Sequence, residues 1–264
     1  MYKVSDIANA IEDLAPASLA EAWDNVGLMV GDPDKAVRRI FVCLDVTAEN
    51  VSHAIDMHAD MIISHHPLLF NPLGRICETD VIGSTVISLI KNDIAVYSAH
   101  TNLDNADGGT NDVLADKLGL YGVRRFTAEE CCDPLGKPLS NIGRVGRLET
   151  PIELADFVSF TKSVLGCRSI RYVGDPSETI STVALCSGAG GDGIYTAYHA
   201  GADVYVTSDI RHHEAQLAYE LGLNLIDAGH FETENTVCEF IPEYLYERFP
   251  SIEIFSSEAE PYFK

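Results

Sequence analysis

The chain has 264 residues, a length that suits two domains better than one. Its 46% hydrophobic and 22% charged residues are typical of a folded globular protein, which excludes a disordered chain and a disulfide-stapled miniprotein. There are 18 Lys and Arg residues against 40 Asp and Glu residues, and the resulting formal net charge of −22 opposes binding to nucleic acid or to an anionic membrane.

The cysteines and the first residues indicate the compartment. The seven cysteines are an odd number and form no C-x-x-C pair, which favours a reducing environment over a disulfide framework. The segment MYKVSDIANAIEDLA has acidic residues in a helical pattern and does not resemble a signal peptide. No apolar run approaches the roughly 18 residues of a membrane span. We therefore expect a cytoplasmic protein without membrane association.

Short apolar runs alternate with amphipathic stretches in the first half of the chain. The pattern predicts helices over residues 4–14, 47–59, 81–93 and 110–120, with Thr47 as a helix cap. It predicts strands over 27–31, 38–45, 60–64 and 94–99. The segment TNLDNADGG, after His100, is expected to be a turn-rich loop.

Residues 119–142 differ in character, because they contain adjacent cysteines, two prolines and two glycines, and we place a domain junction there. Beyond it, strands are predicted over 143–149, 169–174, 180–186, 203–208 and 223–228. Helices are predicted over 153–166, 192–200, 213–222 and about 233–248, the last with a kink or a new start at Pro242.

Short β-branched strands separated by helices are typical of βαβ units. The sequence therefore predicts an α/β fold of two halves, each with a largely parallel sheet covered on both faces. We expect the first domain to span residues 1–125 with the return of 227–264, and the second to span 126–226.

Five predicted strands end in polar residues that can do chemistry. These are Asp45, the pair His65 and His66, His100, Asp209 and His230. Ligand sites in open α/β sheets lie beyond the carboxyl ends of the strands. Any one such residue can simply mark the end of burial, but five together favour a site.

Metal binding is the chemistry that this residue set favours. Imidazoles and carboxylates without cysteine suit zinc, manganese, iron or cobalt. His65 and His66 are adjacent, and neighbouring side chains on an extended chain point to opposite sides. Two ions about 3.5–4 Å apart, as in two-metal hydrolases, could each take one of them.

Two further segments have chelating spacing. In H-F-E-T-E, His230 and Glu234 are four residues apart and share one face if this turn is helical. Asp104 lies four residues after His100. Each pattern alone is weak, since it also fits a surface pair or a turn, and only the combination points to a metal site.

Five motifs, in order along nearly the whole chain, resemble the Ngg-interacting-factor family of YbgI-like dinuclear-metal proteins, whose members include GTP cyclohydrolase 1 type 2 homologs. The motifs are WDNVGLMVGD (23–32), SHHPLLF (64–70), YSAHTNLDNADGGTND (97–112), SGAGGDG (187–193) and SDIRHHEAQLAYELGLNLIDAGHFETE (208–234). The short junction marks a form without the domain that longer members carry in the middle.

The resemblance implies two similar, intertwined three-layer α/β/α halves, two divalent metal ions per chain and a toroidal homohexamer. Carried onto this sequence, it implies these metal ligands, with Glu234 as the bridge: His65, His66, Asp104, His230 and Glu234. It implies that His100 supports a metal ligand or transfers a proton, and it places Asp45 and His213 near the site. We expect His100 and Glu234 to be the catalytic residues.

Hydrolysis is the reaction class that such a centre favours. The positive charge of two divalent ions exceeds the negative charge of the two carboxylates, which favours an anionic or nucleotide-like substrate. A metal-bound water can lose a proton at about pH 7 and so supply a nucleophile. Nothing in these residues selects a purine. One alternative is a non-catalytic metal-binding scaffold or interaction protein.

The other alternative is a dinucleotide oxidoreductase of the Rossmann type. Residues 188–193, G-A-G-G-D-G, match G-x-G-x-x-G, follow a predicted strand and have Asp209 about 20 residues further on. This interpretation leaves the histidines unexplained. The loop could also cradle a phosphate or simply form a tight turn.

Two other features have a structural interpretation. We expect Trp23 to be a core anchor, and nothing in the sequence indicates a lowered thiol pKa at Cys131 and Cys132.

Overall fold

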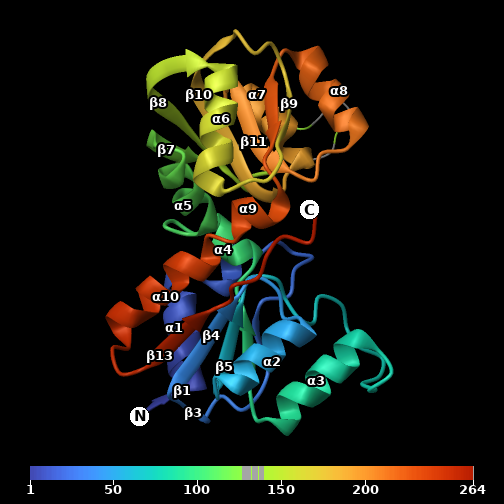
Figure 1. The fold of residues 1–264 in the computed structure, drawn as a ribbon, viewed down its shortest axis with the longest axis vertical. Helices are drawn as coiled ribbons and strands as arrows, with labels where there is room; N and C mark the ends of the chain where they lie inside the picture. Colours follow the sequence, from blue (N-terminus) through green and yellow to red (C-terminus); the bar gives the residue numbers. More distant parts are fainter. Residues whose placement is uncertain (127–131, 133–135, 137–139, 264) are drawn as a thin grey trace. The chain divides into compact units, whose positions relative to one another are not determined.

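The computed structural model describes residues 1–126, 132, 136 and 140–263. The chain divides into two compact units. The first unit contains Met1–Gly109 and Val237–Glu260, and the second contains Thr110–Thr236 and Pro261–Lys264. The chain therefore leaves the first unit after Gly109 and returns to it at Val237, as the colours of Figure 1 show.

The first unit is built on a five-stranded sheet, whose strands are parallel except for the edge strand β2. The strands, in spatial order, are β13 (Glu253–Ser256), β4 (Arg39–Cys43), β5 (Met61–Ser64), β6 (Ala95–Ser98) and β2 (Gly27–Val30). All of β5 and β6 is buried, which explains their uninterrupted apolar sequences. A two-stranded ribbon joins β1 (Tyr2–Lys3) to β3 (Ala36–Val37).

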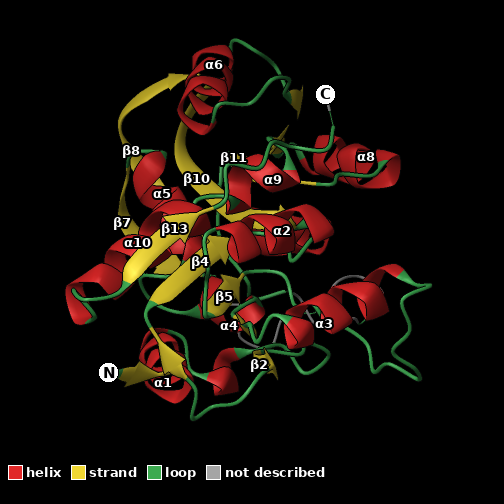
Figure 2. Ribbon diagram, turned by 60° about the horizontal axis from the view of Figure 1, so that its bottom comes forward, coloured by secondary structure: helices red, strands yellow, loops and turns green. Residues whose placement is uncertain are grey.

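Helices cover both faces of this sheet (Figure 2). Helices α1 (Val4–Leu14) and α10 (Val237–Arg248) pack on one face, and α2 (Ala48–Asp56) and α3 (Val81–Lys91) pack on the other. Alternate residues of β4 serve the two layers, since Ile40 faces α1 and α10 whereas Phe41 faces α2 and α3. Two short helices complete the unit, η1 (Ala17–Leu19) and α4 (Thr101–Asn105).

The second unit has a six-stranded mixed sheet, parallel only from β10 to β11 and from β11 to β12. Its strands, in spatial order, are β7 (Leu120–Arg125), β8 (Arg144–Glu153), β10 (Thr179–Ala189), β11 (Val204–Ser208), β12 (Asn224–Asp227) and β9 (Arg171–Val173). The parallel part is the central one, where both faces are covered.

Helices again lie on both faces. Helices α5 (Thr110–Lys117) and α6 (Leu154–Leu165) share one apolar cluster with the sheet, and α7 (Ile194–His199) and α8 (His212–Leu221) share the other. The 3-10 turn η2 (Gly191–Gly193) precedes α7, and α9 (His230–Glu234) follows β12. The predicted three-layer α/β fold is confirmed, with a largely parallel sheet in the first unit and a mixed sheet in the second.

Several local predictions differ from the structure. The expected loop after His100 begins with helix α4, and Leu120–Arg125, expected within a junction, forms strand β7. The last predicted helix is two helices, α9 and α10, and Pro242 lies inside α10 instead of starting a helix. Cys131 and both prolines of the junction lie outside the described residues. Within the described part of the chain, no helix combines the length and the apolar character that crossing a bilayer requires.

Candidate metal centre

In the first unit, three neighbouring parallel strands end beside one another, which brings together the polar residues that follow them. Asp45 comes after β4, His65 and His66 come after β5, and His100 comes after β6. The three imidazole rings lie 5.1–5.5 Å apart between centroids. One ring nitrogen from each lies within 4.8 Å of the others, so the three side chains could hold a metal ion.

Each of these rings is held through its Nδ1 atom. His65 Nδ1 donates to the carbonyl oxygen of Ala99 at 2.9 Å, because a carbonyl can only accept. His66 Nδ1 lies 2.8 Å from Asp45 Oδ1, and His100 Nδ1 lies 2.9 Å from Asp24 Oδ1. Metal-binding histidines characteristically donate Nδ1–H to a carbonyl or carboxylate and use Nε2 as the ligand atom.

Asp24 is a functional residue that the sequence reasoning missed. Its side chain is fully buried, and besides His100 it accepts hydrogen bonds from the backbone and hydroxyl of Thr101. Burial raises the pKa of this carboxyl, but the hydrogen bonds from His100 and Thr101 outweigh burial and leave the pKa well below its usual range. Asp24 is therefore an ionised anchor for His100. It lies within the WDNVGL motif, but nothing in its spacing identifies its partner 76 residues away.

Asp104 reaches the histidines because Thr101–Asn105 is helical. His100 is the residue before this helix, and its carbonyl accepts from the Asp104 backbone at 3.0 Å. The Asp104 carboxylate is 5% exposed and lies 3.6 Å from His65 Nε2, measured from Oδ1. The four-residue spacing of His100 and Asp104 thus places both side chains beside His65.

The expectation that His65 and His66 point to opposite sides is wrong. Strand β5 ends at Ser64, so the alternation of an extended strand no longer applies to the two histidines. Their rings lie 5.3 Å apart at an angle of 44°. Both imidazoles therefore serve the same cluster.

The second unit presents a second set of possible ligands on α9. His230 and Glu234 lie on one face of this helix, with His230 Nε2 2.9 Å from Glu234 Oε2. His230 Nδ1 lies 2.8 Å from Asp209 Oδ2, at the end of the parallel neighbour strand β11. Asp209 has a positive φ of 56°, a conformation that is rare outside glycine and that directs its carboxylate to the ring.

These contacts fit a divalent cation. Two ligand atoms bound to one ion at about 2.1 Å are separated by about 3 Å, close to the 2.9 Å and 3.6 Å between imidazole Nε2 and carboxylate oxygen atoms in the two sets. An imidazole that donates Nδ1–H carries a lone pair on Nε2, so a facing carboxylate requires positive charge between the two atoms. The donor atoms in the two sets are imidazole nitrogens and carboxylate oxygens. Such a set suits zinc, manganese, iron or cobalt.

The glycine-rich segment at the end of β10 packs against this second set. Gly188 has a φ of +61°, and a Cβ atom there would lie 2.0 Å from Glu234 Oε1 and 3.3 Å from His230 Nε2. Its N–H donates to the Thr233 hydroxyl at 3.0 Å, and its carbonyl accepts from the Ser208 hydroxyl at 2.6 Å. The Gly188 backbone is therefore held in place against the Glu234 carboxylate.

The other glycines of G-A-G-G-D-G also have packing reasons. Cβ atoms at Gly190 and Gly193 would meet Thr207 and Tyr205 side chains within 2.4 Å, and one at Gly191 would meet Glu214 at 2.5 Å. Helix α7, which follows, has only six residues. Close packing within the unit explains the motif that resembles a dinucleotide fingerprint.

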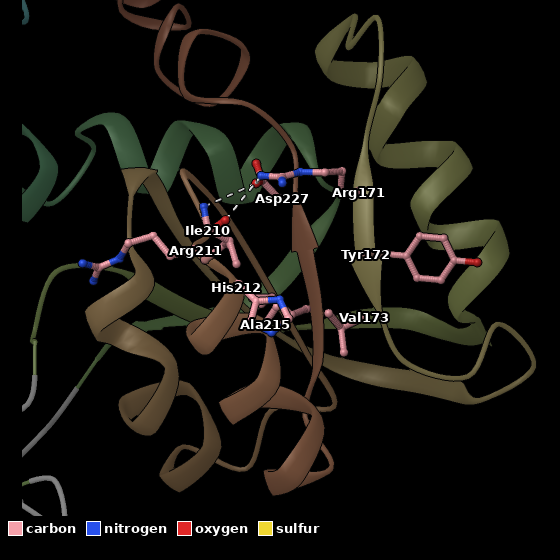
Figure 3. Close-up of a pocket in the computed structure, with 9 residues that line it drawn as sticks. Arg171, Tyr172, Val173, Ile210, Arg211, His212, Ala215 and Asp227 are labelled. Atoms are coloured by element: carbon pink, nitrogen blue, oxygen red, sulfur yellow. Dashed lines mark hydrogen bonds and ion pairs between the residues drawn. The ribbon is translucent and has the colours of Figure 1, made fainter.

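The second unit also contains a pocket of about 280 Å³. Figure 3 shows that the segment after Asp209 and the strands β9 and β12 form it. The Arg171 guanidinium and the Ile210 N–H both reach the Asp227 carboxylate, the latter at 3.3 Å, whereas the Arg211 side chain points away and pairs with Glu214. Since each arginine has a carboxylate partner, the pocket has little excess positive charge.

Two residues named from the sequence lie differently from expectation. Trp23, expected in the core, is 59% exposed, because the hydrogen bonds of Asp24 and not burial of the indole fix this segment. His213 lies exposed near the start of α8. Asp45, by contrast, contacts His66 directly.

Comparison with known proteins agrees with the fold and the motifs. The model of the family Duf34/NIF3 (NGG1p interacting factor 3) matches residues 2–261. A GTP cyclohydrolase 1 type 2 homolog of Clostridium perfringens is 41% identical over 264 residues, 99% of each chain.

Solved structures are similar over their whole length. A Bacillus cereus protein related to NIF3 has a TM-score of 0.90 at 27% identity, covering 100% of this chain and 99% of its own. Reduced HcgD from Methanocaldococcus jannaschii has a TM-score of 0.81 at 32% identity, covering 98% of both chains. The match over residues 2–261 and the 41% identity to a full-length relative show that the chain belongs to the Duf34/NIF3 family.

Proposed function

We propose that the chain is a metal-dependent hydrolase that holds two divalent cations. The residues that would hold them are His65, His66, Asp104, His230 and Glu234. The observation that carries the proposal is the fixing of every imidazole through Nδ1 by an oxygen acceptor, at 2.8–2.9 Å, in both units.

The protein's own groups have defined roles in this mechanism. When bound, the two ions supply a water of lowered pKa and polarise a substrate oxygen. Asp45, Asp209 and the Ala99 carbonyl orient the ligand imidazoles. His100 is the proposed proton-transfer group, because the buried Asp24 carboxylate fixes its Nδ1 at 2.9 Å and leaves Nε2 to exchange the proton.

The charge of the centre favours an anionic substrate. Two divalent ions exceed the charge of the Asp104 and Glu234 carboxylates, so the site is positive within a chain of net charge −22. A nucleotide-like substrate fits this charge. The curated relatives are named GTP cyclohydrolase 1 type 2 homologs, which makes GTP the first nucleotide to test.

We further propose that the protein works in the cytoplasm as a homohexamer, as the family resemblance implies. Light scattering coupled to size-exclusion chromatography tests this assembly. A mass of six chains is the expected result, and a monomer at working concentration contradicts it.

Turnover of a substrate panel by protein of known metal content tests the hydrolase. Metal is removed with a chelator, and zinc, manganese, iron or cobalt is restored separately before GTP, other nucleotides and phosphoesters are offered. Glu234→Gln is expected to abolish turnover while circular dichroism stays unchanged. Glu232→Gln, in the same helix α9, is the matched control and is expected to remain active.

A separate result distinguishes a non-catalytic metal-binding scaffold from a hydrolase. If the wild type binds two ions and turns over no member of the panel with any metal, the hydrolase proposal is wrong and a metal-stabilised interaction protein is the better description. Turnover by the metal-free protein would contradict the proposal equally.

A further inference from the structure

The first unit exposes two large aromatic side chains beside its histidine cluster. Trp23 is 59% exposed and Phe70 is 44% exposed. Their ring centroids are 5.9 Å apart, at an interplanar angle of 48°. The His100 ring lies 6.2 Å from Trp23 and 6.4 Å from Phe70, so this aromatic pair borders the candidate metal ligands.

Hydrogen bonds from the residues after Trp23 fix this pair in place. Asp24 accepts from His100 Nδ1 at 2.9 Å and from the Thr101 backbone at 3.0 Å. The Asn25 side-chain amide donates to the Leu69 carbonyl at 2.5 Å, next to Phe70. The segment that bears Trp23 is therefore tied both to the histidine and to the segment that bears Phe70.

Two exposed aromatic rings contribute less to the free energy of folding than two buried ones would. Aromatic side chains of this size usually bury 150–250 Å², roughly, and supply much of a core or an interface. An exposed apolar pair positioned by a buried carboxylate and a side-chain amide, beside a polar cluster, is typical of a ligand-binding surface.

We propose that Trp23 and Phe70 bind the planar heteroaromatic ring of a mononucleotide, next to the imidazoles of His65, His66 and His100. The inference rests on the proposed function, because it names the substrate class of that same site. Aromatic side chains stack on any nucleobase, since every base has a π-face. The net charge of −22 disfavours a nucleic-acid strand more than a single nucleotide, which carries far fewer phosphate charges.

The position of the pair also determines which part of the ligand reaches the histidines. Because the His100 ring lies 6.2 Å from Trp23 and 6.4 Å from Phe70, a base that stacks on the face of the pair nearer to His100 lies beside this imidazole. The ring and the groups attached to it then lie nearest to the candidate metal ligands. The base, and not only the phosphate, is expected to contribute to affinity.

Trp23 is the only tryptophan of the chain, so its fluorescence reports on this surface alone. Metal-free and metal-loaded proteins are titrated with GMP, AMP and ribose 5-phosphate, with free tryptophan amide correcting for absorbed light. Both nucleotides are expected to quench the emission, and ribose 5-phosphate, which lacks a base, is expected to leave it unchanged.

Phe70→Ala tests the second ring while keeping the reporter. Loss of one stacking contact is expected to weaken nucleotide binding about tenfold. Tyr246→Ala is the matched control, because Tyr246 is 63% exposed on α10 of the same unit. Calorimetry with metal alone is expected to give the same binding for Phe70→Ala as for the wild type.

Three results would overturn the inference: no quenching by nucleotides, equal quenching by ribose 5-phosphate, or unchanged affinity in Phe70→Ala. Emission that changes with protein concentration, together with a shift in mass by light scattering, would assign the pair to a second copy of the chain and also overturn it. If the wild type binds no metal but nucleotides still quench Trp23, the proposed function fails and the base-binding surface stands.

Discussion

At the scale of single residues, the candidate centre repeats one arrangement. An imidazole follows a buried parallel strand, its Nδ1 bonds to an oxygen atom, and its other nitrogen faces the cluster. Three of the four oxygen acceptors are aspartates, Asp24, Asp45 and Asp209. Such partners fix the ring orientation and raise its basicity, so they are as much part of a metal site as the ligands.

Gly188→Ala is expected to weaken metal binding by about tenfold to a hundredfold, because the added Cβ would lie 2.0 Å from Glu234 Oε1 and displace this carboxylate. Isothermal calorimetry measures the affinity. Gly222→Ala is the control, since Gly222 has a similar φ of +68° and open space around it. Equal affinities in the two variants would show that Gly188 does not position Glu234.

The buried cysteines are expected to resist alkylation. Burial raises the pKa of the Cys167 thiol to about 11 and of the Cys238 thiol to about 12, and raises that of Cys43 as well. A raised pKa keeps the thiol protonated at pH 8, and the thiolate is the reactive form. Alkylation of the folded protein at pH 8, mapped by mass spectrometry, should therefore label the exposed Cys132 and spare these three. Labelling of Cys43 at the rate of Cys132 would contradict the buried positions.

The gathering of His65, His66 and His100 could be predicted from the sequence, since these histidines follow apolar runs that form the buried strands β5 and β6. Their partners could not. Asp24 and His100 are 76 residues apart, and no local pattern connects them. The exposure of Trp23 could not be predicted either. Large aromatic side chains are usually buried, whereas the hydrogen bonds of the neighbouring residues hold this one at the surface.

At the scale of elements, two five-residue helices do most of the positioning. Helix α4 brings Asp104 to His65, and α9 brings Glu234 to His230. The H-F-E-T-E spacing predicted the second helix. The first was missed because TNLDNADGG is rich in turn-forming residues, and its helical turn depends on tertiary contacts such as the Asn102 amide donating to the Ala15 carbonyl at 2.7 Å.

A buried ion pair joins α5 to β8 in the second unit. Arg144 is 2% exposed, and its Nε and Nη2 atoms donate to the two oxygens of Asp112 at 2.6 Å and 3.1 Å. Asp112→Ala is expected to lower the free energy of unfolding by about 2 kcal/mol, because it removes the carboxylate that balances a buried guanidinium. Urea denaturation measures the change. Asp116→Ala, exposed on the same helix, should change stability by less than about 0.5 kcal/mol, and an equal loss in both variants would refute the role of the pair.

At the scale of the whole molecule, the alternation of strands and helices was enough to predict an α/β chain of two halves. The largely parallel sheet expected in each half is found in the first unit, whereas the sheet of the second unit is mixed. The alternation could not predict that the edge strands β7 and β9 run antiparallel. Strand β9 lies within the predicted strand 169–174, whereas β7 was missed because it is mostly exposed and has no clear apolar pattern. Strand β13 was missed for the same reason, although it extends the sheet of the first unit beside β4.

The central claim is that acidic and imidazole side chains of this chain hold a pair of cations. Metal content per chain, measured by mass spectrometry after dialysis, tests it most directly when the wild type is compared with Asp104→Asn from the first unit and Glu234→Gln from the second. The account predicts two ions in the wild type and fewer than two in each variant. Two ions retained in both variants, or none in the wild type, would contradict it.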